Sequence, residues 1–145
     1  MTPKSILVPI DFGTLSEHAL DYACGLARKL GAKIDLVNAI GATIPELSAS
    51  LSDSLIESLR VGNRTLLEKL VKDRVGLALF DHLIVEPGDP RTAILKVAEK
   101  LRPDLIIIGS HGRHGLTRLV LGSVAEYVVR HAVPPVLVYH LPPPN

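Results

Sequence analysis

The alternation of short apolar runs with segments of helical period constrains the fold of this chain more than any other feature. Five apolar runs have the length of strands, at residues 5–10, 33–39, 82–85, 104–108 and 135–139. Between them, apolar residues recur about every 3.6 residues, as on one face of an amphipathic helix. This order is typical of βα units wound around a parallel sheet. The sequence therefore predicts a doubly wound, five-stranded α/β fold with helices on both faces.

The length and charge of the chain limit its domain number and its partners. We expect one domain over residues 1–145, because no repeat or linker divides a chain of this length. The 16 lysines and arginines nearly balance the 15 aspartates and glutamates, and only five residues are aromatic. Neither a strong positive field nor stacking platforms are present, so we expect no nucleic-acid partner. No apolar run has the length of a membrane span, and the single cysteine suits a reducing compartment, so we expect a cytoplasmic protein without a membrane partner.

Several short patterns predict where the helices begin. Asp89 followed by Pro90 is a typical helix start, with the carboxylate as cap and the proline in the first turn. Capping-box spacing also occurs at Thr14 with Glu17, Ser54 with Glu57 and Ser123 with Glu126.

The helix predicted after residue 54 has an apolar stripe that we interpret as its core face, since it is too short for a coiled coil. Gly62 and Asn63 interrupt this stripe and are expected to bend the helix. Residues 41–52, before it, are interpreted as a lid. The stripe consists of Leu55, Leu59, Leu66 and Leu70.

The most apolar run, 104–108, has four consecutive branched residues, which is typical of a strand buried on both faces near the sheet centre. Ligands of such sheets bind beyond the carboxyl ends of the strands, where the winding direction reverses. The first and fourth strands are the expected neighbours at that point. The two loops that matter most are therefore 9–11 and 109–123.

The loop after the fourth strand has the composition of a phosphate site. Glycines stand at 109, 112, 115 and 122, and a predicted helix follows at Ser123. Glycine lets backbone approach a ligand closely, and the amides at a helix start attract anions. Arg113 and Arg118 can add positive charge. The spacing differs from that of a P-loop and from the dinucleotide fingerprint.

Two residues in these loops have alternative roles. Asp11 can accept hydrogen bonds from a ribose or help to hold a metal bound to phosphates, but it can equally cap the turn before Thr14. Ser123 can cap its helix or contact a phosphate. His111 and His114 are three residues apart; zinc ligation there is the weaker alternative to contact with phosphate or solvent.

The pattern Gly109-x2-Gly112-x9-Gly122-Ser123 resembles the nucleotide-binding signature of the universal stress protein family. The opening Ile-Leu-Val-Pro-Ile-Asp and the closing Pro-Val-Leu-Val-Tyr resemble the first and last strands of that family, so the resemblance spans essentially the whole chain. It implies sheet order 3-2-1-4-5, a homodimer, and the branch of the family that binds ATP.

The resemblance also implies a role for individual residues. The base and ribose would lie near the first, second and fourth strands, and the phosphates near the glycine-rich loop. The implied nucleotide-binding residues are Pro9, Asp11, Ala39, Ile108, Gly109, Gly112, Arg113, Gly122, Ser123 and Val124. The implied cofactor is ATP, or AMP or ADP, with Mg²⁺ that Asp11 could help to hold through the phosphates.

The last strand bears on the oligomeric state. If residues 135–139 form a sheet edge, they expose unpaired backbone and apolar side chains without a protecting charge. Pairing with the same strand of a second copy would give a two-fold homodimer, whereas the alternative is that residues 140–145 cover the edge.

Two classes of function remain open. The first is a small ATP-binding module that acts in stress adaptation, with slow or no hydrolysis. The second is an ATP-using enzyme, an ATPase or a nucleotidyl-transferring protein, in which Asp11 and Mg²⁺ would form the catalytic apparatus. A receiver domain is rejected, because its acidic pair and its lysine are missing at the expected places. Cys24 is interpreted as a small buried side chain, and Asp35 and His82 receive no role.

Overall fold

The computed structural model describes residues 1–41, 52–110 and 121–142. Five parallel strands form a sheet in the order β3-β2-β1-β4-β5, which confirms the doubly wound fold and the implied order. The strands are β1 Ser5–Pro9, β2 Lys33–Ile40, β3 Phe80–Pro87, β4 Leu105–Gly109 and β5 Val136–Tyr139. The helices are α1 Thr14–Leu30, α3 Asp53–Leu70, α4 Pro90–Leu101 and α5 Ser123–His131, and the π-helical segment η1, Val71–Val75, continues α3.

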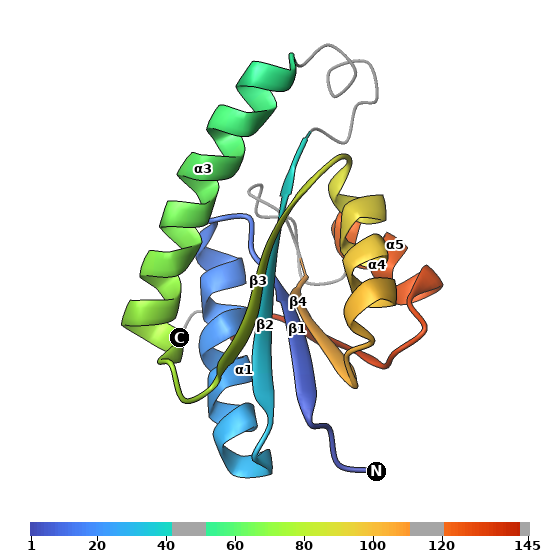
Figure 1. The fold of residues 1–145 in the computed structure, drawn as a ribbon. Coiled ribbons are helices and arrows are strands. Elements are labelled where there is room, and N and C mark those ends of the chain that lie inside the picture. The colour runs from blue at the N-terminus through green and yellow to red at the C-terminus, as the bar shows by residue number, and fades with distance from the viewer. Residues whose placement is uncertain (42–51, 111–120, 143–145) are drawn as a thin grey trace.

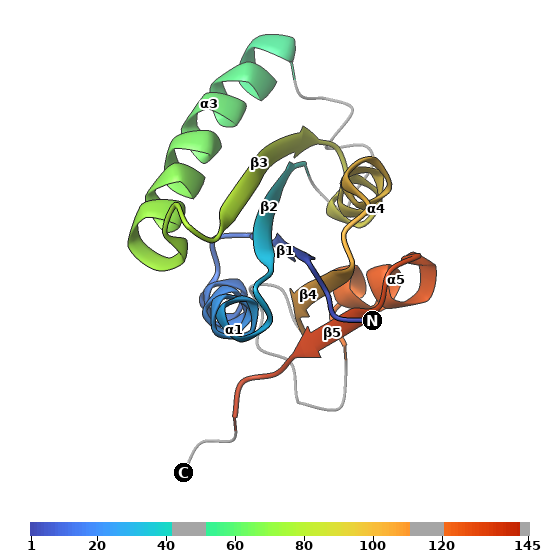
Figure 2. The same cartoon turned by 60° about the horizontal axis from the view of Figure 1, so that its bottom comes forward.

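The helices cover the two faces of the sheet in pairs (Figures 1 and 2). Helices α1 and α3 lie on one face, and α4 and α5 lie on the other. Alternate residues of β1 pack against the helices on opposite faces of the sheet, because successive side chains of a strand point to opposite faces. Ile6 and Val8 belong to the cluster under α1 and α3, whereas Leu7 belongs to the cluster under α4 and α5.

The middle residues of β4 are buried, as the sequence predicts for this strand. Ile106 and Ile107 of β4 are 0% exposed, and β4 lies between β1 and β5. The carboxyl ends of β1 and β4 are therefore neighbours, and the loops that follow them meet at the same edge of the sheet.

Two of the predicted capping boxes are wrong. The N-cap of α1 is Gly13 and that of α5 is Gly122, and neither helix has a side-chain cap. Thr14 and Ser123 lie one position further on, inside the first turn. The start of α4 is confirmed, because the carboxylate of Asp89 accepts a hydrogen bond from the amide of Arg91 and Pro90 stands in the first turn.

Helix α3 differs from the prediction in its start, its continuity and its buried face. Its N-cap is Ser52, which accepts a hydrogen bond from the amide of Leu55, so the predicted cap at Ser54 is wrong. The helix continues through Gly62 without interruption. Leu67 is buried and Leu59 packs on the core, whereas Leu55 is 45% exposed.

The predicted core face of α3 is wrong, because a polar residue belongs to the buried face. Asn63 points inward and donates a hydrogen bond to the side-chain oxygen of Asn38 on β2, at 2.9 Å. Leu66, which was predicted to be buried, is 49% exposed, and Leu70 is only partly buried against the core. No helix among the described residues is both long and apolar enough to cross a membrane.

Strand β3 is longer than the predicted run of 82–85 and contains an irregularity. Its first residue, Phe80, pairs with Ile34 of β2, and the next register pair is Leu83 with Leu36. Two steps along β2 thus face three steps along β3, which defines a β-bulge at Asp81 and His82. The polar residues of this bulge explain why the apolar pattern missed the start of the strand.

Candidate functional site

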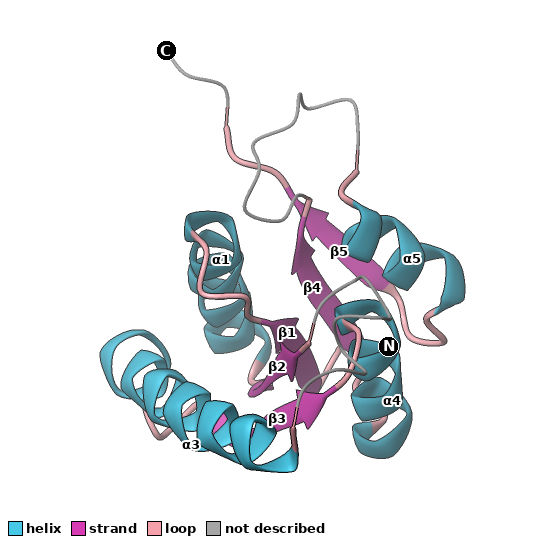
Figure 3. Ribbon diagram, turned by 90° about the horizontal axis from the view of Figure 1, so that it is seen from above, coloured by secondary structure: helices cyan, strands magenta, loops and turns pink. Residues whose placement is uncertain are grey.

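The carboxyl edge of the sheet gathers most of the residues that the resemblance implied. Figure 3 looks down on this edge, where β1 and β4 end next to each other and α5 begins nearby. Pro9 ends β1 and is buried, and Ile108 near the end of β4 is 5% exposed. Gly109 ends β4, and Ala39 lies near the end of β2.

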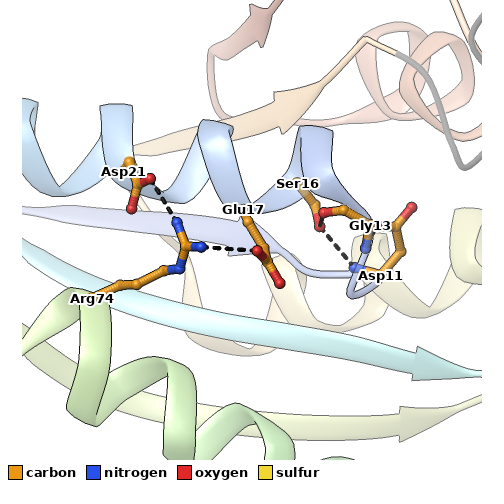
Figure 4. A network of polar contacts seen from close by, with 6 residues as sticks. All are labelled: Asp11, Gly13, Ser16, Glu17, Asp21 and Arg74. Carbon is orange, nitrogen blue, oxygen red and sulfur yellow. Dashed lines mark hydrogen bonds and ion pairs between the residues drawn. The ribbon is translucent and has the colours of Figure 1, made fainter.

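The turn between β1 and α1 is held by Asp11 and Ser16 (Figure 4). The carboxylate of Asp11 accepts a hydrogen bond from the amide of Gly13 at 2.8 Å. The hydroxyl of Ser16 accepts from the amide of Asp11 at 3.3 Å and donates to the carbonyl of Gly13 at 3.0 Å. Asp11 thus has the turn-capping role that the sequence left open, and its carboxylate is fixed at the sheet edge.

The same turn contains a strained residue and a restricted glycine. Phe12 has a φ of 63°, a left-handed conformation that non-glycine residues rarely adopt. A Cβ atom on Gly13 would lie 2.9 Å from the carboxylate of Asp11. The sequence Asp-Phe-Gly is therefore tied to one turn geometry, and such local strain is frequent at functional sites.

An arginine clamps the first half of α1 from the far end of α3. Arg74 of η1 donates to the carboxylate of Glu17 at 2.9 Å and to that of Asp21 at 2.7 Å (Figure 4). All three side chains are partly exposed, so the clamp mainly fixes geometry and adds little net stability. It ties α1, which follows the Asp11 turn, to η1 at the end of α3 on the same face of the sheet.

The two ends of the glycine-rich segment are joined by backbone hydrogen bonds. The amide of Gly122 donates to the carbonyl of Ser110 at 2.6 Å, and the amide of Ser110 donates to the carbonyl of Tyr139 at 2.9 Å. Ser110 is 1% exposed. The start of α5 is thereby fixed beside the end of β4.

Helix α5 begins without a side-chain cap. Its first amides, those of Ser123, Val124 and Ala125, have no acceptor within the helix, and they carry the positive end of the helix dipole. Such a helix start can bind an anionic group through backbone amides.

Gly109 has a packing reason to be glycine. A Cβ atom there would lie 3.0 Å from the Cγ of Leu15 on α1. The close approach of β4 to α1 therefore favours a residue without a side chain here, whatever it contacts in a ligand. Gly112 and Arg113 belong to residues 111–120, which lie outside the described residues, as do His111, His114 and most of the expected lid, 42–51.

A chain of two amides at the ends of β1 and β2 was not predicted. Asn38 is 4% exposed; its Nδ2 donates to the carbonyl of Ile10 at 2.7 Å, and its Oδ1 accepts from Asn63. The chain fixes the carbonyl next to Asp11 and adjoins Ala39. Asn38 is a polar residue in a mostly apolar strand and could have indicated a buried hydrogen bond. Its partner Asn63, however, is 25 residues away in the sequence.

Among the described residues, three titratable groups have shifted pKa values. Burial raises the pKa of Cys24, which is 1% exposed, so the thiol form is favoured and the small-buried interpretation is confirmed. The Arg91 guanidinium lowers the pKa of Asp89 by hydrogen bonding, and Asp89 in turn raises that of Arg91. Arg91 also lies over the ring of Tyr127 on α5, 5.6 Å from its centroid.

The sheet order defines a doubly wound α/β protein. Its candidate site lies where the winding direction reverses, between the fixed turn after β1 and the uncapped helix start after β4. Residues 2–140 match the model of the Universal stress protein family. The chain belongs to that family.

Individual relatives agree with this assignment. Universal stress protein MJ0531 of Methanocaldococcus jannaschii is 33% identical over 141 residues, which cover 96% of this chain and 83% of the relative. The solved structure of protein MJ0577 has a TM-score of 0.84 at 28% identity, over 99% of this chain and 100% of that one. MJ0577 is from the same organism.

Two more distant structures share the fold and were solved with nucleotides. One universal stress protein is in complex with cAMP, with a TM-score of 0.64 at 23% identity over 97% of this chain and 98% of that one. Another, from Archaeoglobus fulgidus, is in complex with dAMP, with a TM-score of 0.63 at 22% identity over 95% and 98% of the two chains.

Proposed function

We propose that this chain is a single-domain, ATP-binding universal stress protein, a small cytoplasmic module that binds adenine nucleotide in stress adaptation. The observation that carries the proposal is the uncapped start of α5, held beside the end of β4 by the hydrogen bond from Gly122 to Ser110. This arrangement offers backbone amides to a phosphate chain in a protein with little net charge.

The roles that we propose for individual residues come from the family resemblance. Gly112, Gly122, Ser123 and Val124 would hold phosphate, with Arg113 as a further contact. Ile108 and Gly109 would lie by the ribose. Pro9 and Asp11 would meet the adenine and ribose side, and Ala39 would line the base pocket. The cAMP and dAMP complexes of distant relatives support an adenine nucleotide as the ligand class.

The chemistry of the donors suits Mg²⁺ bound mainly through phosphate. Mg²⁺ prefers few carboxylates together with phosphate oxygens and water. Asp11 supplies a carboxylate at the sheet edge, and one of its oxygens already accepts the Gly13 amide. Asp11 would thus hold the ion as an auxiliary group, while the nucleotide supplies most of the ligands.

The hydrogen bond from the amide of Gly13 to the carboxylate of Asp11 favours a binding module over the ATP-using enzyme. A general base must reach the proton that it removes, and Asp11 is held by the turn that it caps. Slow phosphate release that Asp11→Asn leaves unchanged agrees with a binding module. Rapid release that Asp11→Asn abolishes would establish the enzyme instead.

Calorimetry with MgATP tests the site itself. Gly122→Val places a branched side chain at the start of α5 and is expected to weaken ATP binding by more than about tenfold, or roughly 1.4 kcal/mol. Gly62→Val is the matched control, because nothing lies within 4 Å of a Cβ atom there and the residue is exposed on α3. Equal affinities of the two variants would refute the assignment.

We also propose that β5 forms a homodimer with β5 of a second copy. β5 pairs with β4 on one side and forms the edge of the described sheet on the other. His140 and Leu141 of the tail that follows are exposed. An apolar edge of this kind is normally covered in solution.

A further inference from the structure

A cluster of two carboxylates and one imidazole lies at the other end of the sheet. Asp35 is on β2 near its start, and Asp81 and His82 are on β3 near its start. These residues are at the amino ends of the strands, whereas the proposed nucleotide site lies beyond the carboxyl ends. The cluster is therefore separate from the site described above.

The β-bulge of β3 brings the cluster together. Regular pairing turns successive side chains to opposite faces of a sheet, so Asp81 and His82 could not both approach the same residue of β2. The extra residue between the pairs Ile34–Phe80 and Leu36–Leu83 changes this alternation opposite Asp35. As a result, one donor atom from each of the three side chains lies within 4.8 Å of the others.

Asp35 is a buried carboxylate whose orientation is fixed. Its side chain is 3% exposed, which is costly for a charged group unless it is well bonded. Oδ2 accepts from the hydroxyl of Ser5 at 3.0 Å, and Oδ1 accepts from the backbone amide of His82 at 3.0 Å. Hydrogen bonds of this kind orient the carboxylate ligands of metal sites.

The donor distances suit a tetrahedral metal ion. The Nδ1 of His82 lies 2.8 Å from Oδ1 of Asp35 and 3.6 Å from Oδ2 of Asp81. The shorter distance is a hydrogen bond between His82 and Asp35, which an entering ion would replace. A tetrahedral ion with bonds of about 2.1 Å holds its ligand atoms about 3.4 Å apart, so these two atoms would separate by roughly 0.6 Å. An ion that takes the lone pair of Nδ1 would displace the proton that Nδ1 shares with Asp35.

The charge of the cluster also favours a cation. In the described ranges, the ion pairs of Asp35 and Asp81 involve only His82, and neighbouring Lys33 donates to the carbonyl of Ala78 instead. Two carboxylates would balance a divalent ion. The side chains of Asp81 and His82 are 51% and 54% exposed, so an ion can enter and keep water as its fourth ligand.

We propose that Asp35, Asp81 and His82 form a binding site for a divalent first-row transition metal, with Zn²⁺ as the best fit. An imidazole ligand favours Zn²⁺ over Mg²⁺ or Ca²⁺, which prefer oxygen ligands alone. The site binds its ion without nucleotide and links the edge strand β3 to β2. It does not depend on the proposed ATP binding.

Titration of the nucleotide-free, chelator-treated full chain with Zn²⁺ alone tests the site. Calorimetry is expected to show one ion per chain, and Co²⁺ is expected to give the visible absorption of a tetrahedral complex. Asp81→Asn and His82→Gln each remove a ligand from an exposed position, and each is expected to weaken Zn²⁺ binding by about tenfold or more. Circular dichroism checks that the fold is kept, since His82→Gln also removes a hydrogen bond to Asp35. Asp35→Asn is secondary, since it also disturbs a buried carboxylate.

Matched controls come from exposed residues elsewhere. Asp53→Asn and His18→Gln remove the same chemical groups from α3 and α1 and should leave Zn²⁺ affinity unchanged. The proposal is overturned if no saturable binding occurs, or if Asp81→Asn and His82→Gln bind Zn²⁺ as the unmodified chain does. It is equally overturned if binding survives His82→Gln but is lost on combined replacement of His111 and His114.

Discussion

At the scale of single residues, two buried polar side chains, Asn38 and Asp35, are bonded across long sequence separations. Asn38 joins the carbonyl of Ile10 to Asn63, and Asp35 joins Ser5 to His82. Each bond offsets the cost of removing a polar group from water. These pairs connect β1, β2, β3 and α3, so they fix the strands relative to one another at both ends of the sheet.

Asp89 provides a test of local electrostatics. Asp89→Ala removes the cap of α4 and is expected to lower the free energy of unfolding by about 1 kcal/mol at neutral pH. Asp89→Asn keeps a capping oxygen but removes the charge that pairs with Arg91, so its cost should be smaller. Denaturant unfolding of the three proteins measures both differences.

The pH dependence of Asp89 has a defined sign. Because Arg91 lowers its pKa in the folded protein, the charged carboxylate stabilises the fold above the unfolded pKa of about 3.9. This contribution disappears as the pH falls through the lower folded value. The difference between the unmodified chain and Asp89→Asn should therefore shrink below about pH 4. A difference that stays constant into acid would contradict the ion pair.

Local residue patterns predicted the start of α4 but not the polar partners. Asp89 and Pro90 are adjacent, and their preferences act within one turn, so the sequence alone indicates the helix start. The partner of Asp35 is 47 residues away and meets it only because of a β-bulge, which apolar periodicity does not reveal. Apolar periodicity likewise does not reveal the contact of Asn63 with Asn38, which is 25 residues away in the sequence.

At the scale of elements, the edge strand β5 can be tested by its hydrogen-bond direction. The carbonyl of Tyr139 accepts from Ser110 of the β4 end, and the carbonyl of Pro135 accepts from Ile106 of β4. Because bonding direction alternates along a parallel strand, the amide of Val138 points to the outer edge.

Val138→Pro removes that outward donor and leaves the bonds to β4 in place, since proline is tolerated at such edge positions. It is expected to convert the proposed dimer into a monomer in sedimentation experiments. Circular dichroism and ATP affinity should stay close to those of the unmodified chain. A dimer that persists in Val138→Pro would exclude pairing through this edge.

Element types were easier to predict than their limits. The branched run in β4 indicated a buried interior strand because every residue serves a packed face. In α3, by contrast, the stripe that contains Leu55 and Leu66 looked like the core face. The helix instead turns Asn63 inward, since a polar partner on β2 is available there. Tertiary contacts decided which face was buried.

At the scale of the whole molecule, burial is distributed unevenly over the layers. Ile6, Leu7 and Val8 of β1 are 0% exposed and lie between helices on both faces. In α3 the only residue of the helix that is buried is Leu67, and most of its surface is in contact with water. Free energies of local opening follow such differences, because segments with few buried contacts open without the rest.

Native-state hydrogen exchange should therefore separate these layers. The amides of β1 and β4 are expected to exchange slowest, through global unfolding, and those of α3 faster by about tenfold or more, through local opening. α1 should remain close to the sheet, because Ala19, Leu20 and Ala23 are fully buried against it. Arg74 of η1 bonds to Glu17 and Asp21 of α1, so Arg74→Ala is expected to speed exchange in η1 while β1 is unaffected. Exchange in α3 as slow as in β1 would show that the helix unfolds only with the whole molecule, despite its exposure.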